Sequence, residues 1–165
     1  MTTTAADFKR DPLRDELRAL YAEVDALLAP FSCANTTECC RFGITGREPY
    51  PTPAEVALVK RAIAKAGITL AAPARRGRAL PVVDAERACP LLSPEGRCRI
   101  YASRPFGCRT FFCDRVEGPG KVPRAEIQRI SRSIADLSAR FSPRDPLPRP
   151  LTHALYPPPR GRTKP

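Results

Sequence analysis

Seven cysteines are the residues of this 165-residue chain whose type and spacing could do chemistry. They form two groups along the sequence: Cys33, Cys39 and Cys40, and then Cys89, Cys98, Cys108 and Cys113. Thiolates that gather in one place repel one another unless a cation neutralises them, and soft thiolate ligands select zinc or iron–sulfur clusters over hard ions. A fold that brings the two groups together would therefore build a metal site, with all seven cysteines as candidate ligands.

Metal binding explains these cysteines better than burial as small hydrophobes or pairing in disulfides does. A single cysteine usually serves as a small buried hydrophobe, but seven in two short groups exceed that expectation. A full set of disulfides is disfavoured by the odd number and by Cys39–Cys40, since neighbouring Cα atoms lie only about 3.8 Å apart. The first 30 residues carry charges throughout and no apolar signal segment, so we expect a reducing, cytoplasmic location.

The residues that other common chemistries need are missing from the sequence or poorly placed. His153 is the only histidine and lies in a proline-rich stretch, where we expect it to be solvated rather than to serve as a base for a cysteine nucleophile. The sequence has no Walker motif and no GxGxxG. No run of about 18 apolar residues exists, so we expect no membrane span. We assign no catalytic residue, and whether the protein is an enzyme stays open.

The charge balance favours an acidic partner only weakly. The net charge is +11, and a basic stretch, Arg75, Arg76 and Arg78, falls where we expect an exposed loop. Abundant arginine, alanine and proline can reflect coding bias, and aromatic residues make up only 7% of the chain. Nucleic-acid binding thus has no support beyond charge, because a stacking platform for bases needs aromatic side chains among the basic ones.

Three amphipathic helices are predicted around the cysteines. The first covers residues 12–28, with Asp11 as the N-cap and Pro12 as the first helical residue. The second covers residues 53–66 and begins with a capping box formed by Thr52 and Glu55. The third covers residues 123–141, where apolar residues recur at intervals of three and four. These stripes should pack against an apolar surface.

The remaining segments predict short or irregular structure. Residues 41–50 could hold a small strand, and residues 91–92 and 99–101 could pair around the turn at 93–96. A short helix is expected over 107–112. From residue 142 the composition becomes rich in proline and arginine, which predicts a disordered basic tail. The fold class is therefore α+β but α-rich, with a cysteine-cluster domain at 1–141 and a tail at 142–165.

Residues 89–113, which read CPLLSPEGRCRIYASRPFGCRTFFC, resemble the second half of the YkgJ-type cysteine-cluster family. That family is named for the chelation of zinc or iron and carries Cys-Pro-x-Leu, a turn, Cys-x-Ile-Tyr and Arg-Pro-x-x-Cys-Arg. The first half of its pattern is Cys-x-x-Cys-x-x-Cys-Cys. Cys33, Cys39 and Cys40 match three of its cysteines, whereas Thr36 stands where the remaining one would be.

The resemblance implies metal binding but no particular activity. One branch of the family, the flagellin lysine N-methylases, is associated with an iron–sulfur cluster and S-adenosylmethionine. Those chains are longer, and no S-adenosylmethionine motif is seen here, so the methylase activity is not carried over.

The expected metal site has four thiolate ligands, as structural zinc and [4Fe–4S] clusters usually do. We favour Cys39, Cys40, Cys89, Cys98 and Cys108 over Cys33 and Cys113. Surplus cysteines, the lack of a CxxC knuckle and the methylase branch favour an iron–sulfur cluster slightly over zinc. Two alternatives remain: a zinc-stabilised module that binds nucleic acid or protein, and a cluster-dependent enzyme that modifies a protein substrate. The oligomeric state is not predicted.

Two arginines among the second group of cysteines are candidates for cofactor binding. Arg104 and Arg109 could donate hydrogen bonds to cysteine sulfur or to an anionic cofactor or substrate. The alternative is that Arg104 and Tyr101 clamp the predicted hairpin without touching a cofactor.

Overall fold

The protein is helix-rich, and its computed structural model describes residues 12–32, 37–70, 87–111 and 117–156. The elements in these ranges are, in order, α1 (Pro12–Leu28), the 3-10 turn η2 (Glu38–Cys40), α2 (Phe42–Thr45), α3 (Pro53–Lys65), the 3-10 turn η3 (Tyr101–Ser103), α4 (Phe106–Arg109), α5 (Arg124–Phe141) and α6 (Leu151–Leu155). Within them, β-pairing is limited to isolated antiparallel bridges. None of the described helices has the length and apolar character needed to cross a bilayer.

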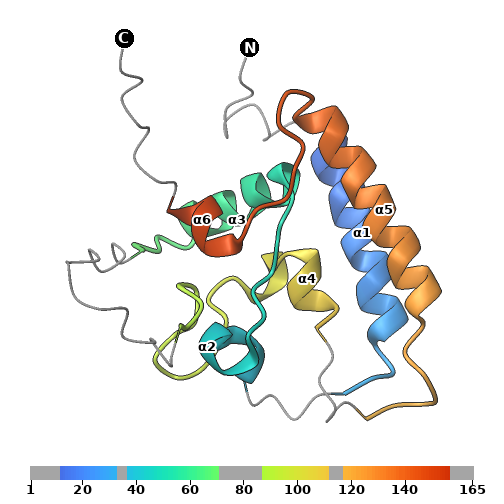
Figure 1. Ribbon diagram of the computed structural model, residues 1–165, viewed down its shortest axis with the longest axis horizontal. Coiled ribbons are helices and arrows are strands. Elements are labelled where there is room, and N and C mark those ends of the chain that lie inside the picture. Colours follow the sequence, from blue (N-terminus) through green and yellow to red (C-terminus); the bar gives the residue numbers. More distant parts are fainter. Residues whose placement is uncertain (1–11, 33–36, 71–86, 112–116, 157–165) are drawn as a thin grey trace.

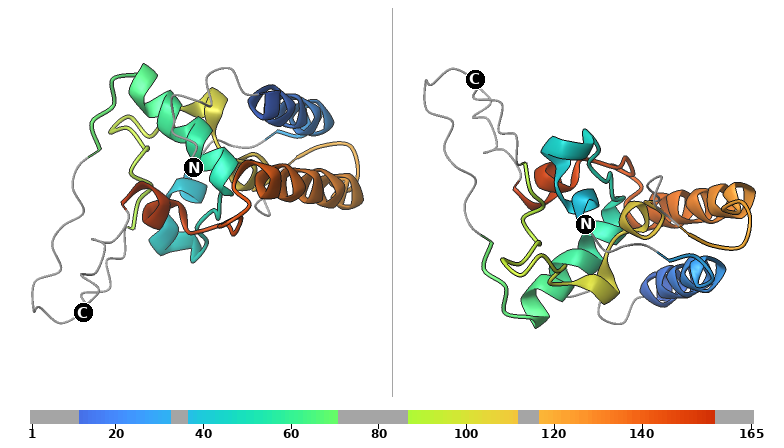
Figure 2. Two further views of the ribbon diagram at one scale, coloured as in Figure 1. Left: turned by 90° about the horizontal axis from the view of Figure 1, so that it is seen from above. Right: turned by 90° about the horizontal axis from the view of Figure 1, so that it is seen from below.

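Helices α1 and α5 lie side by side and run in opposite directions, as Figures 1 and 2 show. Their apolar stripes face each other and are fully buried at Leu17, Val24, Ile130 and Leu137. Ion pairs of Glu16 with Arg140 and of Glu23 with Arg129 cross the exposed edge of this pair. Because such exposed pairs contribute at most about 1 kcal/mol each, the buried stripes provide most of the stability.

Helix α3 connects the helical pair to the cysteine-bearing loops. Its residues Ala54 and Leu58 pack into the core cluster formed with α1 and α5. The next residue, Val59, is fully buried in a second cluster together with Phe42, Cys89, Leu91, Ile100 and Leu151. Helix α3 therefore has two buried sides, and Cys40, Cys89 and Cys98 lie on the second.

The predicted helices are confirmed, and their ends agree with the local signals. Helix α1 covers the predicted residues 12–28, α3 begins with the predicted capping box of Thr52 and Glu55, and α5 begins one residue later than predicted. Helix α4 overlaps the short helix predicted over 107–112, but it begins one residue earlier, just after Pro105, and ends at Arg109.

The predicted β-structure is largely replaced by turns. Residues 42–45, within the segment where a small strand is predicted, form the one-turn helix α2. The predicted hairpin is not confirmed: it is reduced to a single bridge between Leu92 and Cys98, closed by a turn that contains Gly96 at φ 74°. Pro90 and Pro94 have no N–H to donate to a ladder, and Tyr101 enters η3 instead of extending a strand.

The disorder predicted from residue 142 is not confirmed for the part of the tail that the structure describes. Residues 149–151 run beside residues 49–51, where the Leu151 N–H donates to the Pro49 carbonyl at 2.9 Å and the Arg149 N–H donates to the Pro51 carbonyl at 3.3 Å. Leu151, in α6, is only 1% exposed. The rest of the tail, 157–165, and the basic stretch Arg75, Arg76 and Arg78 lie outside the described residues.

Candidate metal centre

Five of the seven cysteines lie in described residues, and these five are free thiols. Cys39 and Cys40 lie in η2, Cys108 lies in α4, and Cys89 and Cys98 lie on the loop between α3 and η3. Cys89 is buried, Cys39 is exposed, and the other three are intermediate. Cys33, Thr36 and Cys113 lie outside the described residues.

Backbone pairing brings the two groups of cysteines together. The Cys89 N–H donates to the Cys40 carbonyl at 2.6 Å, and the neighbouring residues Arg41 and Ala88 form an antiparallel bridge. The bridge between Leu92 and Cys98 then folds Cys98 back toward the segment that carries Cys89. Cys40, Cys89 and Cys98 consequently share one apolar cluster, although Cys40 and Cys89 are far apart in sequence.

The thiols lie close enough to influence one another electrostatically. Burial raises the pKa of Cys89 to about 11, and the charges of Cys98, Glu48 and Cys39 add to this effect. Burial also raises the pKa of Cys108 strongly, assisted by Cys89, Cys98 and Cys39. A cation at this place would reverse these effects, since metal binding stabilises the deprotonated thiolate.

The thiols of the adjacent residues Cys39 and Cys40 form a hydrogen bond with each other, and their pKa values move in opposite directions. Their side-chain hydrogen bond lowers the pKa of Cys39 to about 6 and raises that of Cys40. Cys39 is the exposed member, so it presents the more acidic thiol to solvent.

The donor chemistry fits a soft cation, although the thiols are not closed around one. Among the residues that the structure describes, no three cysteine, histidine, aspartate or glutamate side chains converge closely enough to hold a metal ion. The match to a soft cation therefore rests on the thiol donors themselves and on the apolar cluster that Cys40, Cys89 and Cys98 share. His153, in α6, is exposed and takes no part in this cluster.

Glu55 links the helical core to the cysteine that lies in α4. It is only 3% exposed, and its Oε1 accepts hydrogen bonds from the Tyr21 hydroxyl at 2.9 Å and from the Phe106 N–H at 2.7 Å. Its Oε2 completes the capping box with Thr52. Sequence reasoning found this carboxylate as a cap of α3 but missed its contact with α4, for which no local signal exists.

Arg109 is buried and contacts protein groups on several sides. Its Nε donates to the Arg104 carbonyl at 3.0 Å, its Nη2 donates to the Ala102 carbonyl at 2.7 Å, and its Nη1 pairs with Asp25 of α1. The guanidinium also lies 4.2 Å from the centre of the Tyr21 ring. These contacts fasten η3 and α4 to α1, and no local pattern in the sequence identifies Asp25 as the partner.

Arg104 lies close enough to Cys39 and Cys98 for its charge to act on their thiols. Its guanidinium stacks on Tyr101 at 3.9 Å, and its nearest contact with Asp25, from Nη2, is long at 3.8 Å. Its Nε is buried without a hydrogen-bond partner among the described residues. Burial raises the pKa of Cys98, and the Arg104 charge opposes this rise. The stacking on Tyr101 agrees with a clamp, whereas the orphaned Nε leaves a donor available near the cysteines.

The comparisons with known proteins give one result. Residues 32–131 match the model of the CxxCxxCC family, which is described as a "putative zinc- or iron-chelating domain". The match spans all seven cysteines, including those outside the described residues. Neither the curated proteins nor the solved structures include a significant match. The chain therefore belongs to the CxxCxxCC family of zinc- or iron-chelating domains.

Proposed function

We propose that the protein binds an iron–sulfur cluster, or alternatively zinc, through cysteines from both groups. The observation that carries this proposal is the hydrogen bond from the Cys89 N–H to the Cys40 carbonyl, which ties the two groups together. Cys39, Cys40, Cys89, Cys98 and Cys108 are the preferred ligands, and Cys33 and Cys113 are further candidates. A bound cluster would supply one-electron chemistry, whereas zinc would supply structural cross-linking.

The cluster is favoured over zinc on chemical grounds. A closed zinc site uses four ligands, often from CxxC knuckles, and the sequence has an excess of cysteines but no such knuckle. An anionic cluster also benefits from donors directed at its sulfurs, and the Arg104 Nε, which is buried without a hydrogen-bond partner among the described residues, would serve as such a donor. We assign Arg104 the role of donor to the cofactor.

Arg109 would act on the same site indirectly. Because its Nε binds the Arg104 carbonyl, it fixes the backbone from which the Arg104 side chain extends. The pairing of Arg109 with Asp25 joins this backbone to α1, which packs into a core that contains no cysteine.

The test is elemental analysis of protein purified without oxygen. Iron, acid-labile sulfide and zinc are counted per chain, together with the visible absorption spectrum. Equal amounts of iron and sulfide in a brown sample would support the cluster, and one tightly held zinc in a colourless sample would support the alternative. A sample with neither metal after reconstitution, or a full metal load in Cys89→Ser, would contradict the proposed site.

A further inference from the structure

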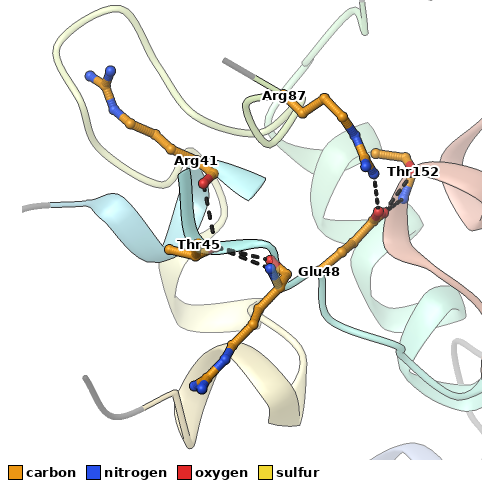
Figure 3. Close-up of polar contacts among 6 residues, drawn as sticks. Arg41, Thr45, Glu48, Arg87 and Thr152 are labelled. Atoms are coloured by element: carbon orange, nitrogen blue, oxygen red, sulfur yellow. Dashed lines mark hydrogen bonds and ion pairs between the residues drawn. The ribbon is translucent and has the colours of Figure 1, made fainter. Parts of the chain in front are cut away.

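Glu48 lies between the segment that carries Cys89 and the C-terminal helix α6. Its Oε1 accepts hydrogen bonds from the Thr152 N–H at 2.7 Å and from the Thr152 hydroxyl at 2.6 Å. Its Oε2 accepts a hydrogen bond from Arg87 Nη2 at 2.9 Å (Figure 3). The Glu48 side chain is only 10% exposed, which shelters its contacts with Thr152 from bulk water and strengthens them, whereas its partner Arg87 is 58% exposed.

Arg87 connects the Glu48 carboxylate to the backbone segment that carries Cys89. It precedes Cys89 by two residues, and its carbonyl accepts a hydrogen bond from the Gly43 N–H at 3.3 Å. The intervening residue, Ala88, forms the bridge to Arg41. Glu48 thus holds the side chain of a residue whose backbone already lies beside the first cysteine group.

Helix α6 completes one side of the same cluster. Leu151 is buried in the cluster that contains Cys89, and Leu155 packs against that cluster, as do Cys40 and Cys98. Burial raises the pKa of the Tyr156 hydroxyl, and the Cys89 charge contributes, which places the end of α6 near this thiol. The helix is short, so its position depends on these contacts rather than on its own helical stability.

We propose that Glu48 is a positioning residue for Cys89 and that α6 is part of the metal centre, where it shields Cys89 from solvent. The carboxylate performs both tasks by holding Arg87 with one oxygen and Thr152 with the other. The part of this inference that concerns metal retention rests on the proposed function, whereas the shielding of Cys89 does not. Loss of the Glu48 contacts should release α6 and expose the Cys89 thiol.

The experiment compares Thr152→Val, which removes the hydroxyl but keeps the shape, with Thr152→Ser, which keeps the hydroxyl. Glu48→Gln is added as a stronger change, because its amide donor faces a donor on Arg87. Asp145→Asn is the control, since Asp145 pairs with Arg149 on the exposed part of the same segment. Circular dichroism confirms that each variant retains its helices.

Two rates are measured on the full chain. The first is alkylation of Cys89 by iodoacetamide in the metal-free protein, resolved by mass spectrometry of peptides. The second is transfer of bound zinc to a coloured chelator after loading with zinc alone. For Thr152→Val we expect both rates to rise on the order of tenfold, which corresponds to one hydrogen bond to a charged group. Thr152→Ser and Asp145→Asn should behave as the unaltered chain does.

The two measurements separate the inference from the proposed function. Faster alkylation of Cys89 in Thr152→Val without any zinc binding would support the shielding role and contradict the zinc alternative of the proposed function. Zinc binding with unchanged alkylation and transfer rates in Thr152→Val would overturn the inference and leave the metal site intact. An equal effect of Thr152→Ser and Thr152→Val would also overturn it, because the hydroxyl would then have no role.

Discussion

The Glu55 carboxylate accepts a hydrogen bond from the Phe106 N–H at 2.7 Å, across 51 positions of the chain. The same carboxylate caps α3 and binds Tyr21 of α1, so three helices meet at one buried anion. Phe106 is the first residue of α4, and Cys108 follows two residues later. The helical core therefore determines where the segment that carries Cys108 begins, whether or not a metal is bound.

Replacing Glu55 with glutamine should destabilise the protein strongly. The amide group would direct a donor at groups that are themselves donors, and buried polar groups would lose their partners. We expect Glu55→Gln to lower the free energy of unfolding by about 3 kcal/mol, measured by urea denaturation of the metal-free protein. Glu126→Gln, at an exposed position in the first turn of α5, is the control and should change it by less than about 1 kcal/mol. Equal effects of the two variants would contradict the role of Glu55.

Arg109 should not tolerate a change to lysine. An ammonium group cannot reproduce the planar fork that binds two carbonyls and Asp25, and it stacks less well on Tyr21. We expect Arg109→Lys to lower the free energy of unfolding by about 2–3 kcal/mol, seen as a lower melting temperature. The exposed Arg132→Lys on α5 should have little effect. A melting temperature that is the same in both variants would exclude a stabilising role for the Arg109 contacts.

Tyr21 should make the stability of the protein depend on pH in the alkaline range. Burial raises the pKa of Tyr21 well above its ordinary value of 10.0, and the Glu55 charge adds to this effect. Above that ordinary value the unfolded chain loses the hydroxyl proton while the folded chain keeps it, so the free energy of unfolding falls as pH rises.

The measurement is urea denaturation at a series of pH values from neutral to about one unit above the ordinary tyrosine pKa. At neutral pH, Tyr21→Phe should be less stable than the unaltered chain by about 1–2 kcal/mol, because Glu55 loses a donor. Its stability should fall less steeply with pH. Parallel pH profiles would show that Tyr21 ionises normally.

Arg104 should influence the affinity for metal. Removing its charge takes away the cation that favours the deprotonated form of Cys98 and the donor that we assign to the cofactor. We expect Arg104→Met to bind zinc about tenfold more weakly in competition with a chelator of known affinity. Arg99→Met, an exposed change on the same loop, is the matched control. Equal affinities of the two variants would contradict a role of Arg104 in binding.

The helices could be predicted from the sequence because their signals are local. Pro12 and the apolar stripe that follows it are enough to define α1, and the capping box defines the start of α3. The resemblance of residues 89–113 to the cysteine-cluster motif also predicted the family, and the family-model match confirms it. Their convergence, however, depends on pairing of Cys40 with Cys89, which no local pattern specifies.

The C-terminal segment shows why composition alone was misleading. Prolines and arginines around Leu151 predict disorder, because such segments seldom bury enough apolar surface to become ordered. Leu151 nevertheless finds an apolar cluster already present, and Thr152 finds the Glu48 carboxylate. Glu48 lies 104 positions before Thr152, and the apolar cluster is built from residues between Phe42 and Ile100, so no local pattern around residue 151 reveals either partner.

The two buried sides of α3 bear on which part of the fold stays ordered when the cysteine loops do not. Leu58 belongs to the core with α1 and α5, whereas its neighbour Val59 belongs to the cluster of the cysteines. Loosening of the cysteine cluster should leave the first core intact, since no cysteine belongs to that core. Loss of the metal that we propose would therefore leave α1, α3 and α5 packed together as a partly ordered scaffold instead of a fully unfolded chain.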